Sequence, residues 1–240
     1  MATDERLRSA AVGYGQLDYT KSPIYLRLTS RQEFHRLKSC GKEPWTVRWI
    51  EEYLKPGDVL YDVGANVGAY TLVAALAVPE ARIVAFEPGP ANFAALCANL
   101  ELNAVSDRVT PIPLALGDQP RSASLDADAS VAGASPRVGT DAAGGARVLV
   151  DRLDDVTERF DLPLPDHLKL DVDGAELAVL AGAERLLADA DTRSLMVELD
   201  REREGAVVER LRASGFELAE RASGSDRSRS MPTYGLFARA

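Results

Sequence analysis

The chain has 240 residues, 46% of them hydrophobic and 27% charged, which is typical of one soluble domain large enough to form a core without disulfides or metals. A net charge of −9 makes nucleic acid and anionic membranes poor partners. The N-terminus lacks the apolar stretch of a signal peptide, and no apolar run approaches the roughly 18 residues of a membrane span. The sequence therefore predicts a cytoplasmic protein.

Residues 1–42 carry few secondary-structure signals and are expected to form an N-terminal extension, a candidate lid on a domain that spans 43–240. Within the extension, Ile24, Leu26 and Leu28 alternate in the manner of a short strand. The stretch PWTVRWIEEYL that follows has a broad apolar face at helical spacing, and a Pro-Gly pair ends it. The domain is therefore expected to begin with a helix.

Strand and helix patterns then alternate along the chain. Strands are expected at 59–64, 82–88, 108–118, 167–174 and 194–200, and helices at 69–78, 91–103, 175–190 and 204–215. Residues 146–156 indicate a strand running into a turn, and FELAERA and YGLFARA indicate a terminal antiparallel pair. This alternation predicts right-handed βαβ crossovers and a mostly parallel sheet covered by helices on both faces.

Residues 119–146 interrupt this rhythm, because they are rich in Ala, Ser, Gly and Asp and poor in large apolar side chains. A segment that buries so little is expected to be a mobile loop with one short strand. Two interpretations stay open: a dispensable surface insertion, or a lid over the carboxyl edge of the sheet.

The first strand-to-helix turn, YDVGANVG, has the composition of a ligand-binding turn. Gly64 and Gly68 allow a sharp turn and a close approach to a ligand, and Asn66 tolerates a left-handed backbone. The helix that begins near Ala69 directs free N–H groups at the same place. The spacing is neither the dinucleotide GxGxxG nor a P-loop.

Two acidic residues follow consecutive strands at this edge. Asp62 precedes the first turn, where a carboxylate suits an ammonium group, and Glu87 ends the next strand, 23 positions after Gly64. An acid near this spacing meets ribose hydroxyls in related sheets. An amine, a ribose and a carboxylate facing helix N–H groups together describe S-adenosylmethionine.

Six stretches resemble the FkbM family of S-adenosylmethionine-dependent methyltransferases. They are KPGDVLYDVGANVGAYTLVAA, RIVAFEPGPANFAALCANLELN, LALGD, VLVDRLDDV, LKLDVDGAELAVLAGAERLL and SLMVELD, and they span roughly residues 43 to 200. Family members often carry Glu at the position of Asp173, which is a conservative departure.

The resemblance implies a class I methyltransferase fold, a Rossmann-like three-layer α/β structure with a seven-stranded sheet in the order 3-2-1-4-5-7-6. It implies methyl transfer from S-adenosylmethionine to a hydroxyl of a small molecule or sugar in natural product biosynthesis, with S-adenosylhomocysteine as product. The expected cofactor contacts are Asp62, Gly64, Asn66, Gly68 and Glu87, with the adenine beside Leu116, Gly117 and Asp118.

The strand LKLDVDG supplies candidates for the chemistry. Lys169, Asp171 and Asp173 share one side of a strand by its period of two, and Asp171 falls near the expected methyl group. Asp171 is a candidate to accept the acceptor's proton, hold the cofactor's amine or bind a metal; alternatively it pairs with Lys169 or caps the next helix. Glu198, at the end of the following strand, is a candidate substrate contact.

Two alternatives to methyl transfer stay open for this sequence. A nicotinamide-dependent oxidoreductase could use a similar sheet, but the GxGxxG motif is missing. A non-catalytic protein that binds an adenosyl ligand is the other alternative. No metal is expected, because no neighbouring Asp-Asn pair follows the fifth strand and the two cysteines lack metal-ligand spacing.

Overall fold

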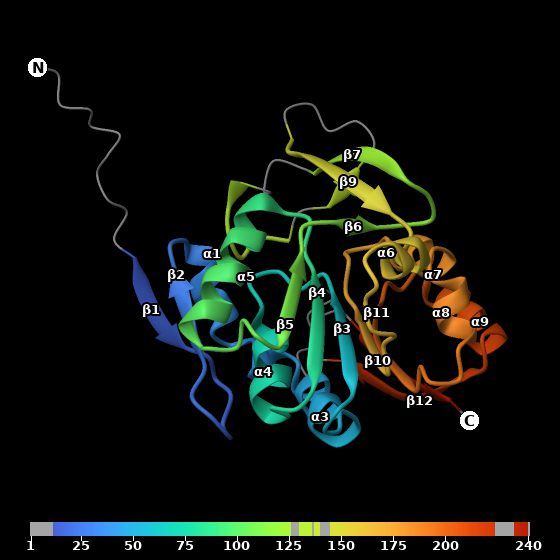
Figure 1. The fold of residues 1–240 in the computed structure, drawn as a ribbon, viewed down its shortest axis with the longest axis horizontal. Helices are drawn as coiled ribbons and strands as arrows, with labels where there is room; N and C mark the ends of the chain where they lie inside the picture. The colour runs from blue at the N-terminus through green and yellow to red at the C-terminus, as the bar shows by residue number, and fades with distance from the viewer. Residues whose placement is uncertain (1–11, 126–129, 136, 140–144, 224–232, 240) are drawn as a thin grey trace, which may run out of the picture.

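The computed structural model describes residues 12–125, 130–135, 137–139, 145–223 and 233–239. Its centre is a seven-stranded sheet in the order β12-β13-β11-β10-β3-β4-β5 (Figure 1). Five strands are parallel: β3 (Val59–Val63), β4 (Arg82–Phe86), β5 (Val109–Ile112), β10 (His167–Leu170) and β11 (Ser194–Leu199). Two strands at one edge pair antiparallel: β12 (Phe216–Ser223) and β13 (Thr233–Arg239). The predicted α/β class with a mostly parallel sheet is confirmed.

Counted in chain order within this sheet, the strands run 3-2-1-4-5-7-6 from β5 to β12. The strand labels of Figure 1 do not reproduce this order directly, because they also count the strands of two smaller sheets. One pairs β1 (Gly13–Gln16) with β2 (Tyr25–Leu28), and the other contains β6 (Ala115–Leu116), β9 (Arg147–Asp151), β7 (Arg121–Leu125) and β8 (Val138–Gly139). Figure 1 shows the second small sheet beyond the carboxyl ends of β4 and β5.

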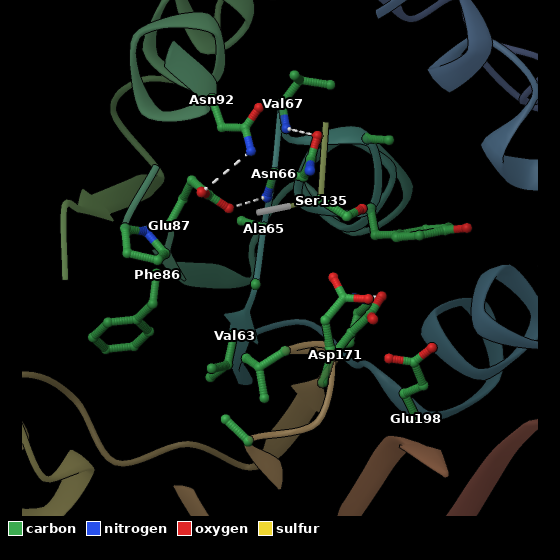
Figure 2. A pocket seen from close by; sticks show the side chains of 18 of the residues that line it. Val63, Ala65, Asn66, Val67, Phe86, Glu87, Asn92, Ser135, Asp171 and Glu198 are labelled. Carbon is green, nitrogen blue, oxygen red and sulfur yellow. Dashed lines mark hydrogen bonds and ion pairs between the residues drawn. The ribbon is translucent and has the colours of Figure 1, made fainter. Parts of the chain in front are cut away.

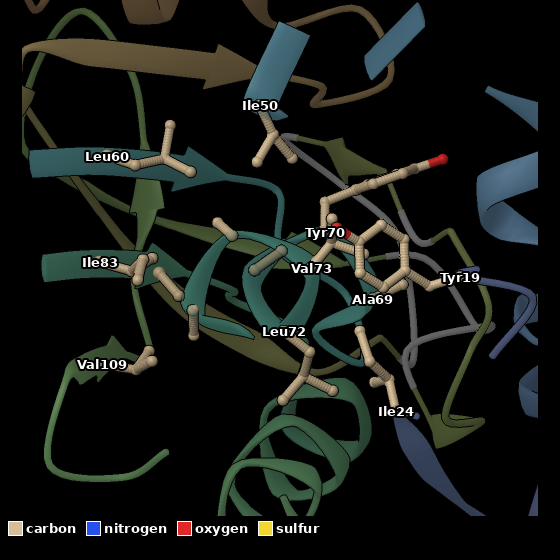
Figure 3. Close-up of a cluster of buried hydrophobic side chains, with 14 of the residues drawn as sticks. Tyr19, Ile24, Ile50, Leu60, Ala69, Tyr70, Leu72, Val73, Ile83 and Val109 are labelled. Carbon is tan, nitrogen blue, oxygen red and sulfur yellow. The ribbon is translucent and has the colours of Figure 1, made fainter. Parts of the chain in front are cut away.

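Helices cover both faces of the main sheet, which gives the expected three layers. One face packs against α3 (Pro44–Tyr53), α4 (Ala69–Ala77) and α5 (Pro90–Leu102), and the other against α6 (Leu153–Arg159), α7 (Glu176–Ala181), α8 (Glu184–Ala188) and α9 (Glu204–Ala213). Side chains of β3 alternate between the two cores, with Leu60 in one and Tyr61 in the other. Figure 3 shows Leu60 and Ile83 facing α4. None of the described helices is long and apolar enough to cross a membrane.

The position of α3 is fixed by polar contacts at the amino edge of the sheet. The indole N–H of Trp49 donates to Ser194 Oγ at 2.9 Å, and the same oxygen lies 2.7 Å from His167 Nδ1. His167 Nε2 in turn lies 3.1 Å from Asp58 Oδ2. These buried bonds hold α3 against β10 and β11, and thereby set where the N-terminus of α3 lies at the opposite edge.

The structure corrects several predicted boundaries. The strand expected at 108–118 is two strands, β5 and β6, interrupted around Pro113, and the strand expected at 167–174 ends at Leu170. The insertion 119–146 contains β7 and β8 instead of one strand; its residues 126–129, 136 and 140–144 lie outside the described part, and its mobility stays a prediction. The extension, of which residues 1–11 are not described, includes β1, α1 (Arg31–Arg36) and α2 (Ser39–Lys42), which the sequence did not indicate.

The helix expected at 175–190 is divided into α7 and α8 at Gly182. A Cβ atom at this position would lie 2.0 Å from the Gly117 carbonyl oxygen. The Gly182 carbonyl also accepts a hydrogen bond from the Asp154 N–H at 3.0 Å, instead of continuing the helix. The segment after β6 therefore packs so closely against residue 182 that only glycine fits there. The helix is interrupted at this position.

We expect Gly182→Ala to destabilise the fold by about 1–3 kcal/mol, because the added methyl group overlaps the Gly117 carbonyl. Gly205→Ala in α9 is the matched control, since its Cβ would meet nothing within 4 Å. Urea denaturation of both variants measures the difference. Equal stability of the two variants would contradict the packing argument.

Candidate active site

The carboxyl ends of β3, β4, β10 and β11 surround a cavity of about 1010 Å³, a volume that includes the open solvent at its mouth. This is the edge where open α/β sheets bind ligands. Predicted site residues on its wall are Gly64, Asn66, Glu87, Leu116, Asp171, Asp173 and Glu198. The structure thus brings together side chains from four strand ends (Figure 2).

The turn after β3 is fastened to its neighbours through the main chain. The N–H groups of Gly64 and Ala65 donate to the Phe86 carbonyl oxygen at 2.9 and 3.0 Å. Gly64 has φ of 85°, and a Cβ there would lie 1.9 Å from the Asp171 carbonyl oxygen. Asn66 takes the left-handed conformation expected for it, with φ of 53°. Glycine is therefore required at 64, where β3 and β10 converge.

Glu87 is buried at the end of β4 and has three donors around it. Its carboxylate accepts hydrogen bonds from the N–H groups of Asn66 and Gly89 at 2.8 and 2.7 Å, and from Asn92 Nδ2 at 3.3 Å (Figure 2). Burial raises the pKa of Glu87 above its ordinary value, against the lowering effect of these bonds. The carboxylate is thus held rigidly on the wall, at the place predicted for a ribose contact.

A buried cation, Lys169, forms part of the floor of the cavity. Lys169 Nζ is 3.0 Å from Asp171 Oδ2, 3.7 Å from Asp62 Oδ1 and 5.2 Å from the centre of the Tyr70 ring. Burial lowers the pKa of Lys169, but the charges of Asp171 and Asp62 outweigh it and raise this pKa above its ordinary value. The pairing of Asp171 with Lys169, one of the alternatives left open by the sequence, is what the structure shows.

Asp62 lies deeper than a direct ligand contact requires. It is 1% exposed and is absent from the described residues that line the cavity. Its Oδ2 accepts a hydrogen bond from the Thr71 hydroxyl at 2.6 Å, while Oδ1 has no hydrogen-bond partner within the described structure. Its role as a cofactor contact stays a prediction.

Asp171 and Glu198 project into the cavity from neighbouring strands (Figure 2). The Tyr234 hydroxyl donates to Asp171 Oδ2 at 3.2 Å. Burial acts to raise the pKa of Asp171, but Lys169 lowers it below its ordinary value. Burial and the charge of Asp171 raise the pKa of Glu198 to about 9. Asp171, which pairs with Lys169, is therefore the more acidic member of the pair, and Glu198 is the member that holds a proton more readily.

Asp173 lines the cavity because of the turn that follows β10, and not because side chains alternate along a strand. The strand ends at Leu170, and Asp173 has φ of 52° in the connection that follows. Burial and then the charge of Asp171 raise the pKa of Asp173. Its position beside Asp171 is thus produced by the turn before α7.

The remaining predicted residues lie off the wall. Gly68 is the N-cap of α4 with φ of 89°, and the Gly117 N–H donates to the Asp151 carbonyl oxygen at 2.9 Å. The Asp118 side chain is 48% exposed and pairs with Arg121 at 2.8 Å. Of the three residues predicted to lie beside the adenine, Leu116 lines the cavity, whereas Gly117 and Asp118 do not. The adenine contact stays a prediction.

The extension and the insertion meet over the mouth of the cavity. Asn66 Nδ2 and Asn92 Nδ2 both donate to the Ala134 carbonyl oxygen, at 2.6 and 3.1 Å. Arg36 of α1 donates to the Gly133 carbonyl oxygen and to Ser135 Oγ, both at 2.9 Å. Ser135 and Val138 of the insertion thus line the cavity, and the role of the insertion as a lid stays a prediction.

Several wall residues were missed by sequence reasoning: Arg36, Glu43, Tyr70, Asn92 and Tyr234. A signal existed for two of them. Asn92 follows Glu87 by five positions at the start of α5, and Tyr234 pairs in register with Glu198 once the terminal strand is placed next to β11. The others depend on how the extension folds.

Residues 62–218 match the Methyltransferase FkbM domain. The chain belongs to the FkbM methyltransferase family. It is 31% identical over 160 residues to hexuronic acid methyltransferase AglP of Haloferax volcanii, covering 66% of this chain and 63% of that protein. It is 52% identical over 56 residues to 31-O-demethyl-FK506 methyltransferase FkbM of Streptomyces tacrolimicus, covering 23% of this chain and 22% of that one. The recognised family is thus confirmed.

A solved methyltransferase FkbM from Methylobacillus flagellatus KT superposes with a TM-score of 0.57 at 16% identity, covering 77% of this chain and 44% of that one. This likeness confirms the class I methyltransferase fold. The FkbM-family chain described here spans less than two thirds of the length of each of these three proteins.

We expect Lys169→Met to destabilise the protein by about 3–5 kcal/mol, because Asp62 and Asp171 would lose their shared buried cation. Lys38→Met is the control; its side chain is exposed, so a change within about 0.5 kcal/mol is expected. Chemical denaturation compares the two. A Lys169→Met variant as stable as the control would show that the cluster does not depend on the cation.

Glu198 predicts a pH dependence of stability. Its pKa rises from 4.5 to about 9 on folding, so the folded state retains a proton that the unfolded chain releases. The contribution of Glu198 is fully present below about pH 4.5 and is lost as the pH rises towards 9. Relative to Glu198→Gln, the parent should lose stability across this window by up to about 1.4 kcal/mol per pH unit.

Urea denaturation at pH 5, 7 and 9 measures this loss, with Glu202→Gln as an exposed control. Parallel pH curves for the parent and Glu198→Gln would contradict the retention of a proton by Glu198 in the folded state.

Proposed function

We propose that this protein is an S-adenosylmethionine-dependent methyltransferase that methylates a hydroxyl group of a small molecule, either a sugar or a natural product. The observation that carries the proposal is the ring of strand-end groups around one cavity in a chain of the FkbM family. The names of its relatives, a hexuronic acid methyltransferase and a demethyl-FK506 methyltransferase, support the class of acceptor.

The residues present fit an adenosyl donor. Gly64 lines the cavity and has no side chain, so a ligand can approach the main chain of the turn closely. Glu87 presents a carboxylate held by hydrogen bonds at the end of the adjoining strand. Buried oxygens of Asp62 and Glu43 lack hydrogen-bond partners within the described residues, as expected where a ligand supplies donors. We propose that Glu87 binds the ribose hydroxyls and that the turn from Gly64 to Gly68 faces the methionyl end.

Asp62 supports this site from one layer below. It holds the Thr71 hydroxyl on α4 and shares Lys169 with Asp171, so it fixes both the helix N-terminus and the floor. Leu116 lies on the wall at the place proposed for the adenine, and Gly117 and Asp118 continue that segment.

When bound, S-adenosylmethionine supplies a methyl group that is already activated for displacement. The chain has then to orient the acceptor and exclude water, which accounts for up to roughly 7–11 kcal/mol of a barrier. Asp171 is the charged member of the carboxyl pair, and we propose that it accepts the proton of the acceptor's hydroxyl. Protonated Glu198 and the Tyr234 hydroxyl stabilise that charge until the proton arrives.

We expect the parent to bind S-adenosylhomocysteine and 5′-methylthioadenosine, which share the adenosine portion, and Glu87→Gln to weaken both by tenfold or more, about 1.4 kcal/mol. The reason is that both ligands present the same ribose hydroxyls to the altered group. Titration calorimetry measures the affinities, and Glu80→Gln on the exposed loop before β4 is the control.

A rise in the melting temperature of the parent with S-adenosylhomocysteine, and none with NAD, is expected because the turn lacks the dinucleotide spacing. Unchanged affinities in a folded Glu87→Gln variant would remove Glu87 from the site. Methyl transfer to nitrogen instead of oxygen, found by mass spectrometry after incubation with an acceptor panel that includes a hexuronic acid, would overturn the proposed acceptor class.

A further inference from the structure

Glu43 is a buried carboxylate that the sequence did not single out. It stands immediately before Pro44, the first residue of α3, and outside the segment that matches the family domain. It is 4% exposed and lies on the wall of the cavity together with Asp171 and Tyr234. The position of α3, anchored through Trp49, therefore places a charged group directly at the site.

One oxygen of Glu43 has no bonding partner. Its Oε1 lies 3.3 Å from the ammonium of Lys42, which is 46% exposed, but Oε2 is buried and accepts no hydrogen bond from any described residue. Tyr70 lies close enough to Glu43 for both charge and hydrogen-bond interaction with its carboxylate, but the Tyr70 hydroxyl donates its proton to the Ser39 carbonyl oxygen at 2.8 Å and leaves Oε2 without a donor. A buried acceptor left in this state destabilises the protein unless a ligand satisfies it.

The charges around this oxygen favour a cation. Lys169 is the buried ammonium at the floor, and its pKa is raised by Asp171, Asp62 and Glu43 together. Asp62 and Asp171 thus pair with this ammonium, and Glu43 acts on it by charge. Lys42 is partly solvated, and Arg36, on the same wall, acts by charge on Asp171. Since uncompensated buried charge is costly, the site is completed by a positively charged donor of hydrogen bonds.

Glu43 and Asp62 differ in access. Both have a buried oxygen without a hydrogen-bond partner in the described structure, but Asp62 lies behind the wall and Glu43 lies on it. Asp62 also has its other oxygen fixed by Thr71. A ligand in the cavity therefore reaches Glu43 first.

We infer that Glu43 Oε2 accepts a hydrogen bond from the ammonium group at the methionyl end of the methyl donor, and that Asp62 acts behind it as a positioning residue. This inference rests on the proposed function, since it assumes that the cavity binds the adenosyl donor. The ammonium supplies the donor that Glu43 Oε2 lacks, and it adds a positive charge beside carboxylates of which two already pair with Lys169.

The test compares two ligands that differ in the amino acid arm, which carries that ammonium together with a carboxylate. S-adenosylhomocysteine carries the amino acid arm, and 5′-methylthioadenosine has the same adenosine and thioether without it. In calorimetry on the full chain, Glu43→Gln should weaken S-adenosylhomocysteine binding by tenfold or more and leave 5′-methylthioadenosine within about twofold. Glu52→Gln, an exposed position on the same helix, should change neither.

Equal losses for both ligands, or no loss for either in a folded variant, would overturn the inference while leaving the proposed function standing. If the parent binds neither ligand, the proposed function and the inference both fail. Should Glu43→Gln not fold, Glu43→Asp keeps the charge but withdraws it by one methylene, and it should show the same selective loss at reduced size; equal effects on both ligands would again contradict the assignment.

Discussion

The ion pairs of Lys169 hold the site together. A lysine on the central strand of a parallel sheet is costly, and it is tolerated here because Asp62 and Asp171 lie within 3.7 and 3.0 Å of its ammonium. Lys169 and Asp62 are register partners on adjacent strands, so the sheet itself sets their proximity. Lys169 and Asp62 therefore connect the floor of the cavity to the start of α4, where Thr71 bonds Asp62, and to Asp171 of the carboxyl pair.

The upper part of the site depends on amide groups. Asn66 lies in the turn after β3 and Asn92 lies at the start of α5, yet both donate to the single carbonyl of Ala134. The Asn66 N–H meanwhile binds Glu87, and Asn92 also bonds both Glu87 and the Gly133 N–H. The proposed ribose contact and the covering segment are therefore linked through two side chains.

Local patterns predicted the part of the site that strand ends define. The turn glycines, Glu87 and Asp171 could be placed because parallel strands end at a common edge. Depth could not be predicted: spacing located Asp62 along the chain but did not show that Thr71 and Lys169 enclose it. Alternation placed Asp173 correctly at the site for an incorrect reason, since the strand stops at Leu170. Glu43 and Tyr234 reach the wall through long-range packing, which no short motif records.

The origin of Glu43 and Arg36 has a practical consequence for any excised domain. Both precede residue 62, where similarity to the family domain begins, yet both form the enclosure around the cavity. A fragment trimmed to the recognisable homology would retain the glycine turn and Glu87 while leaving one side of its own chamber open to water. Conversely, exchange of the segment before residue 62 between family members would replace the wall that Arg36 and Glu43 form and would leave nearly all of the main sheet unchanged.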